Sequence, residues 1–211
     1  MAYPTSTSET FADGIVHVAG LALAIPASAY LLANINVPST VWSATALYVG
    51  TLIFALAASA LYHLLPFDRA RPTLGRIDHA SIYFKIAGSY TPVAILIGSG
   101  FAYGVLTLVW TLAVAGAMAK LWFWRLDAKG SLTLYLGMGW LSVLLVWPMW
   151  QTLPGAALIL IIGGGAIYSL GTLIYAHPGM RYQNALWHCF VLVASASLFG
   201  AIAVSVQAAS S

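Results

Sequence analysis

The sequence predicts an all-α membrane protein: a bundle of seven transmembrane helices with a cytoplasmic N-terminus and the C-terminus outside. The first observation behind this prediction is composition, because 61% of the 211 residues are hydrophobic and only 6% are charged. A soluble domain carries about a quarter charged residues. The second is a series of long apolar runs, and the third is an uneven distribution of basic residues along the chain.

The apolar runs define the helices. A helix that crosses the hydrocarbon core of a bilayer needs about 20 predominantly apolar residues. Between the runs lie clusters of Pro, Gly, Asn and Asp, which are typical of turns. On this basis residues 1–211 form a single transmembrane domain whose helices span approximately 14–34, 41–64, 79–98, 101–120, 131–150, 155–176 and 185–207.

The basic residues predict the orientation. Those outside the apolar runs all fall in segments that reach one side of the membrane: Arg69, Arg71, Arg76, Lys120, Arg125, Lys129 and Arg181. The loops after the first, third and fifth helices contain neither Lys nor Arg. By the positive-inside rule the basic side is cytoplasmic. Lys85 is the only charged residue in the interior of a predicted span, and its long side chain can snorkel toward that side.

Composition also limits the partners. The sequence contains no basic stripe and no nucleic-acid-binding motif, so we expect membrane lipids as partners and no nucleic acid. A single cysteine, Cys189, excludes an internal disulfide.

Polar residues that could carry chemistry gather at the predicted cytoplasmic ends of the helices. Ser59 and His63 are four residues apart, so they share one face of the second helix. Asn184 and His188 repeat this spacing at the start of the last helix. Asp78 begins the third helix at the same depth. Two histidines and a carboxylate form a donor set suited to zinc, with water as the fourth ligand.

A further set of residues enters the first helix from the same side. Glu9, Asp13 and His17 are each four residues apart and so follow one helix face. Each polar residue also has a simpler interpretation. A single His near a helix end is often an interfacial residue, and Asp78 could cap the third helix, where a carboxylate interacts well with the helix dipole.

Several segments resemble the hemolysin III proteins, the bacterial branch of the progestin and adipoQ receptor family that includes the adiponectin receptors. The resemblance covers essentially the whole chain. Its most specific part is Asp-His followed by the IAGSYTP run. It is carried by SALYH (59–63), RIDHASIYFKIAGSYTP (76–92), LYLGMGWL (134–141), GGAIYSLGTLIY (164–175) and NALWHCFVL (184–192).

The resemblance implies a seven-helix bundle in the bacterial plasma membrane with a zinc site near the cytoplasmic face. Its Ser-x-x-x-His motif implies Ser59 and His63, and its aspartate in the third helix implies Asp78. The family's last-helix His-x-x-x-His is only half present, because His188 matches but Asn184 replaces the first His.

The family's first motif, Glu-x-x-x-Asn-x-x-x-His, is matched by Glu9 and His17, with Asp13 in place of Asn. Leu198 stands where many relatives have another His. These departures leave three alternatives: a weaker zinc site, a site that uses Asp78 directly, or no metal at all.

Three functions follow as hypotheses. The first is a zinc-dependent intramembrane hydrolase of a lipid amide or ester, in which Asp78 orients water or acts as the base and Ser59 supports it by a hydrogen bond. The second is a non-enzymatic membrane regulator or receptor-like bundle, in which a metal ties helices together. The third is membrane lysis through a pore, which gains little support because the helices lack a polar stripe to line a channel.

Overall fold

The computed structural model describes residues 6–123, 128–177 and 179–210, and this part of the chain is helical with no strand. The helices are α1 (Thr7–Asn34), α2 (Ser39–Leu64), α3 (Arg71–Ile97), α4 (Gly100–Met118), the π-helical turn η1 (Ala119–Phe123), α5 (Ala128–Trp140), the 3₁₀ turn η2 (Leu141–Leu145), α6 (Val146–Thr152), α7 (Gly155–Ala176) and α8 (Gln183–Ala208).

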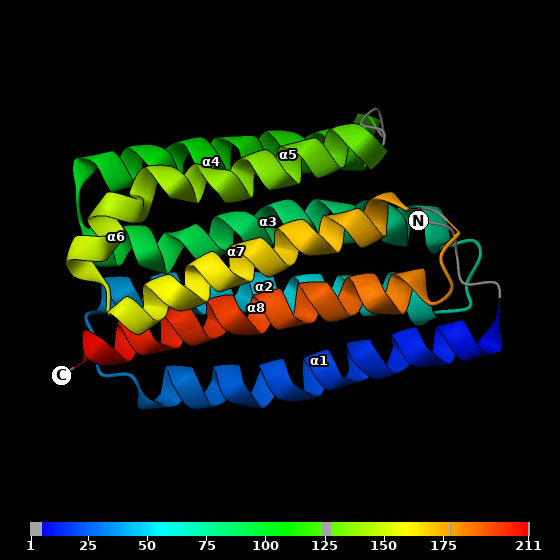
Figure 1. Cartoon of the computed structure of the whole chain (residues 1–211), viewed down its shortest axis with the longest axis horizontal. Helices are drawn as coiled ribbons and strands as arrows, with labels where there is room; N and C mark the ends of the chain where they lie inside the picture. Colours follow the sequence, from blue (N-terminus) through cyan, green and yellow to red (C-terminus); the bar gives the residue numbers. More distant parts are fainter. Residues whose placement is uncertain (1–5, 124–127, 178, 211) are drawn as a thin grey trace.

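Seven of the resulting helical stretches are long and apolar enough to cross a membrane, which confirms the predicted all-α bundle. The fourth runs from α4 into η1, and the fifth joins α5, η2 and α6. The helices lie side by side along the long axis of the molecule, and α1 begins at the end opposite to the one where α8 finishes (Figure 1).

The fifth span changes helix type just before a proline. Pro148 lies in α6 and cannot donate to the carbonyl of Leu144, and its ring crowds that carbonyl. Leu144 is in the 3₁₀ turn η2, whose tighter hydrogen-bonding pattern replaces the α-helical one there.

Two helices begin earlier than the apolar runs suggest. α1 begins at Thr7 and α3 at Arg71, where hydropathy predicts starts near 14 and 79. The N-cap of α3 is Ala70, with Pro72 in its first turn. Asp78 is therefore inside α3 and does not cap it, and its position has to be explained by side-chain contacts.

The basic residues that the structure describes outside the apolar runs lie at the end of the bundle where α1, α3 and α8 begin; Arg125 and the Lys129 side chain lie outside the described part. The predicted orientation makes this end cytoplasmic. A topology reporter fused after Ser211 should therefore be active only outside the cytoplasm, as seven crossings from a cytoplasmic N-terminus require. Activity of a cytoplasmic reporter at that position would contradict the orientation.

Gly88, within the IAGSYTP run, lets α3 approach α2 closely. A Cβ atom at this position would lie 2.1 Å from Oγ1 and 3.1 Å from Cβ of Thr51. In membranes small residues permit such close helix contact, which takes the place of the hydrophobic effect in holding helices together.

We therefore expect Gly88→Ala to lower the melting temperature of the detergent-solubilised protein, at a cost of about 1–3 kcal/mol because the helices must separate. Gly104→Ala in α4 is the matched control, since a Cβ there meets nothing within 4 Å and Ala favours the helix. Equal melting temperatures for the two variants would contradict the close packing of α2 and α3.

Candidate metal centre

Four polar side chains from three helices meet at the basic end of the bundle. Asp13 and His17 lie one turn apart on α1, His63 is in the last turn of α2, and His188 is in the second turn of α8. α1 packs against both α2 and α8. α1 and α8 begin at this end and α2 finishes there (Figure 1). Distances of 2.6 to 3.7 Å join the Asp13 carboxylate to the three imidazole rings.

The Asp13 carboxylate is at the centre of this group. Its Oδ1 lies 2.6 Å from Nδ1 of His188, and its Oδ2 lies 3.6 Å from Nδ1 of His63. Ligand atoms of these three residues all lie within 4.8 Å of one another. All three side chains are buried, and Asp13 has no exposed surface. A buried carboxylate is costly unless it is compensated, and here the histidines surround it.

His17 adds a third imidazole. Its Nε2 lies 3.7 Å from Oδ1 of Asp13. The centroid of its ring is 4.4 Å from that of His188 and 5.8 Å from that of His63. Three imidazole rings from three helices are thus arranged around one carboxylate.

The donor atoms fit a metal ion. Oδ2 of Asp13 is buried and has no hydrogen-bond partner within the described residues, and the same holds for Nε2 of His17. Zinc is bound in proteins by imidazole nitrogens and carboxylate oxygens, and catalytic zinc sites use three protein ligands. Asp13, His63 and His188 would supply such a set.

Asp78, the carboxylate donor expected from the sequence, is not one of the three donors in this group. It is buried on α3 and lines the same cavity as His63, His188 and Ser59. Ser59 on α2 lines the cavity together with it. The structure therefore brings these residues to one cavity, and their roles there stay predictions.

Glu9 and Asn184, the other two residues expected from the sequence, are not among the three metal-ligand candidates. Glu9 accepts a hydrogen bond of 3.0 Å from the backbone N–H of Tyr182, so it ties the start of α1 to the turn before α8. Asn184 is buried one turn before His188. The His that the family resemblance leads one to expect at position 184 is absent, and the carboxylate beside His188 comes from Asp13 on α1.

The part played by Asp13 was not predicted from the sequence. The sequence did contain a pattern that points to it, because Asp13 and His17 lie on one face of the first helix at the predicted depth of His63 and His188. What the sequence does not give is the rotation of α1 about its axis, and this decides whether Asp13 faces the bundle or the lipid.

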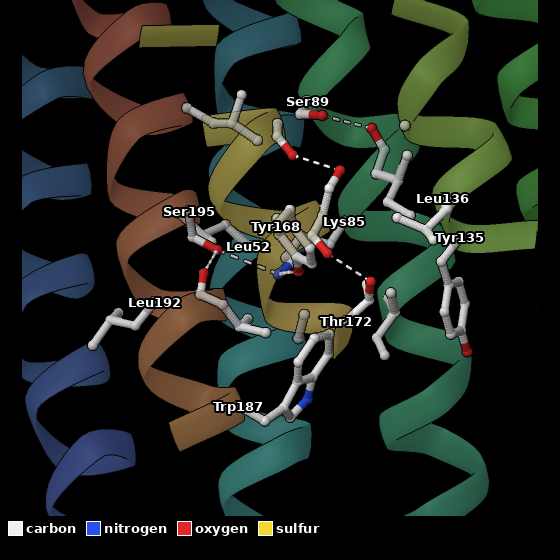
Figure 2. A pocket seen from close by; sticks show the side chains of 18 of the residues that line it. Leu52, Lys85, Ser89, Tyr135, Leu136, Tyr168, Thr172, Trp187, Leu192 and Ser195 are labelled. Carbon is white, nitrogen blue, oxygen red and sulfur yellow. Dashed lines mark hydrogen bonds between the residues drawn. The ribbon is translucent and has the colours of Figure 1, made fainter. Parts of the chain in front are cut away.

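A cavity of about 320 Å³ extends from this group into the bundle. His17, His63, Asp78 and His188 line it toward the basic end, and mostly apolar side chains from α2, α3, α5, α7 and α8 line the rest. Lys85, which could have snorkelled toward the cytoplasm, instead points into this cavity (Figure 2). The arrangement places a group of side chains that could hold a metal ion beside a mostly apolar space.

Comparison with known proteins agrees with the resemblance seen in the sequence. The family described as "Haemolysin-III related" matches residues 5–199. The chain is 36% identical to "Hemolysin-3 homolog" of Bacillus subtilis (strain 168) over 196 residues, covering 90% of this chain and 91% of that protein. It is 33% identical to "Hemolysin-3" of Bacillus cereus over 194 residues, covering 90% and 89%.

A more distant similarity extends to mammals. "Monocyte to macrophage differentiation factor" of Homo sapiens is 29% identical over 159 residues, which cover 74% of this chain and 64% of that protein. The family match spans nearly the whole bundle, and it includes the Asp13, His63 and His188 donors. On this evidence the chain belongs to the haemolysin-III related family of multi-pass membrane proteins.

Proposed function

We propose that this protein is a zinc-dependent hydrolase of a lipid amide or ester in the bacterial plasma membrane. Asp13, His63 and His188 would hold the metal. The observation that carries the proposal is the buried set of three donors within 4.8 Å of one another, in which Oδ2 of Asp13 lacks a hydrogen-bond partner among the described residues. Zinc, when bound, supplies a Lewis acid that activates water for hydrolysis.

Asp78 is the candidate general base. Its carboxyl group lines the cavity together with His63 and His188, so it can accept a proton from water held there. Ser59 lines the same cavity, and its hydroxyl group would support Asp78 or the water by a hydrogen bond. His17 would help to position Asp13, because its Nε2 faces Oδ1 of that carboxylate.

The cavity supports a lipid as the substrate. Apart from the groups named above, its lining is dominated by side chains such as Leu52, Ile86, Leu136 and Leu192. An apolar wall with a few placed polar groups is the usual form of a small-molecule site. A lipid chain can occupy such a space with its amide or ester near Asp78.

A second candidate function is a membrane regulator in which the metal has a structural role. It is favoured by the origin of the donors, since Asp13, His63 and His188 come from three different helices. A metal bound to all three would hold the ends of α1, α2 and α8 together and stabilise the folded bundle by mass action.

The proposals are tested by metal analysis of the detergent-purified protein, followed by incubation of the metal-replete protein with amide and ester lipids. The hydrolase should contain about one zinc ion per chain, as expected for a site of three protein ligands, and should release acyl products. Zinc without product release would favour the regulator. Absence of any bound metal after purification in metal-replete medium would contradict both.

A further inference from the structure

α1 and α8 are joined at two levels at the basic end of the bundle. The inner contact is the one of 2.6 Å between Oδ1 of Asp13 and Nδ1 of His188. The outer contact lies nearer the starts of the two helices, where Oε1 of Glu9 accepts a hydrogen bond of 3.0 Å from the backbone N–H of Tyr182. Glu9 and Asp13 are four residues apart, so they lie on one face of α1. This face of α1 therefore places two carboxylates against the beginning of α8 (Figure 1).

The outer contact has the chemistry of a helix cap. Ser6 is the N-cap of α1, and its side chain accepts a hydrogen bond from the backbone N–H of Glu9. This is the Ser-x-x-Glu arrangement of a capping box, in which the glutamate side chain bonds the backbone N–H of an N-cap residue. Tyr182 is the N-cap of α8, so the carboxylate of Glu9 caps a second helix. A negative charge at that place also interacts favourably with the dipole of α8.

The N-cap of α8 is poorly suited to hold the helix start by itself. The side chain of Tyr182 makes no capping hydrogen bond to α8, and its backbone is left-handed, with φ 59° and ψ 24°. In the described part of the chain it is the one residue other than glycine with a positive φ. This conformation is unfavourable for a residue with a Cβ atom, and it persists only where the surroundings enforce it. The hydrogen bond to Glu9 helps to enforce it here.

The start of α8 is also tied to α7, through Gln183. Its Nε2 donates hydrogen bonds to the carbonyls of Ile174 and Tyr175, at 2.9 and 3.3 Å. These bonds do not involve α1. Relative to α1, the height of α8 is fixed at Tyr182 by Glu9 and, about 9 Å further along the helix, at His188. A displacement of α8 at its start therefore moves His188 as well.

We propose that Glu9 is a positioning residue for the metal group: by capping α8 from α1, it holds His188 beside Asp13, so that both can bind one metal ion. Glu9 is not one of the three donors, and its effect passes through the position of α8. The consequence for metal binding rests on the proposed function, whereas the capping of α8 does not.

The first test is hydrogen exchange, measured by mass spectrometry on the detergent-solubilised protein in the presence of a chelator. Glu9→Ala should speed exchange in peptides that cover residues 182–188 by about threefold to tenfold, because one hydrogen bond that holds the helix start is lost. Glu9→Gln should exchange at about the wild-type rate, because Gln keeps a carbonyl oxygen that can accept the same hydrogen bond.

Asp68→Ala is the control for net charge, because it removes an almost fully exposed carboxylate in the turn before α3. It should leave exchange at residues 182–188 unchanged. Wild-type exchange in Glu9→Ala would overturn the proposal.

The second test is zinc affinity, measured by competition titration against a chelator. It should fall by about threefold to tenfold in Glu9→Ala and stay at the wild-type value in Glu9→Gln and Asp68→Ala. Faster exchange together with wild-type zinc affinity in Glu9→Ala would overturn the positioning role. A wild type that bound no zinc would contradict the proposed function, and the exchange measurement would still decide whether Glu9 caps α8.

Tyr182→Gly provides an independent variant. It keeps the backbone N–H that Glu9 accepts, and glycine adopts positive φ readily, so exchange at the start of α8 and zinc affinity should both be retained. Loss of zinc affinity in Tyr182→Gly, together with its retention in Glu9→Ala, would overturn the proposal and assign the support of α8 to the Tyr182 ring.

Discussion

Replacing Asp13 with Asn should leave the purified protein with little or no bound zinc, whereas the wild type retains it. Asn preserves the shape of the side chain, but its neutral amide is a much poorer zinc ligand than a carboxylate. The affinity should fall by more than the about tenfold to hundredfold that follows loss of a group supporting a ligand. Competition titration against a chelator measures the change, and metal analysis of the purified protein gives the occupancy.

Two further variants make this result specific. His177→Ala should retain zinc, because His177 is exposed in the turn after α7. Asp78→Asn should also retain it, because Asp78 is not in the group of three donors. Zinc loss in Asp78→Asn together with zinc retention in Asp13→Asn would assign the carboxylate ligand to Asp78 instead.

If the protein is a hydrolase, Asp78→Asn should reduce turnover by about a hundredfold to ten-thousandfold, the usual contribution of a general base. The substitution removes the proton acceptor and keeps the shape of the side chain, so the bundle and its zinc content should be unchanged. Product release from lipid amides and esters, measured with metal-loaded protein, gives the rate.

Asp68→Asn is the matched control, because Asp68 is almost fully exposed in the turn before α3, where it pairs with Arg71 at 3.7 Å. It should hydrolyse lipid at the wild-type rate. Equal product formation by Asp78→Asn and wild type would assign the reaction to another base or to a contaminating enzyme.

The sequence predicted the helices well because the membrane imposes a simple requirement. Every span must satisfy its backbone hydrogen bonds internally and present an apolar surface to lipid, and both requirements are visible as long apolar runs. Helix ends were less predictable. Hydropathy marks the hydrocarbon core, whereas helical hydrogen bonding continues beyond it, as α3 does from Arg71 to Asp78.

The candidate site could be predicted only in part. Depth follows from position along each helix, so His63 and His188 could be expected at one level. Which side chains then touch depends on the rotation and lateral packing of each helix, which a sequence with weak amphipathic character does not fix. The central position of Asp13 among the histidines was therefore seen only in the structure. The same is true of the contacts that Lys85 makes with Tyr168 and Ser195, because each of these residues is more than 80 positions from Lys85 in the sequence.

The distribution of the donors along the chain has a consequence for biosynthesis. Asp13 belongs to α1 and His188 to α8, and 175 residues separate the two in the sequence. The carboxylate of Asp13 therefore enters the membrane before its closest partner has been made. Only the arrival of α8 beside α1 provides the 2.6 Å contact between them. The Asp13–His188 contact therefore requires α1 and α8 to be packed together, and it cannot form in a chain that lacks the last described span.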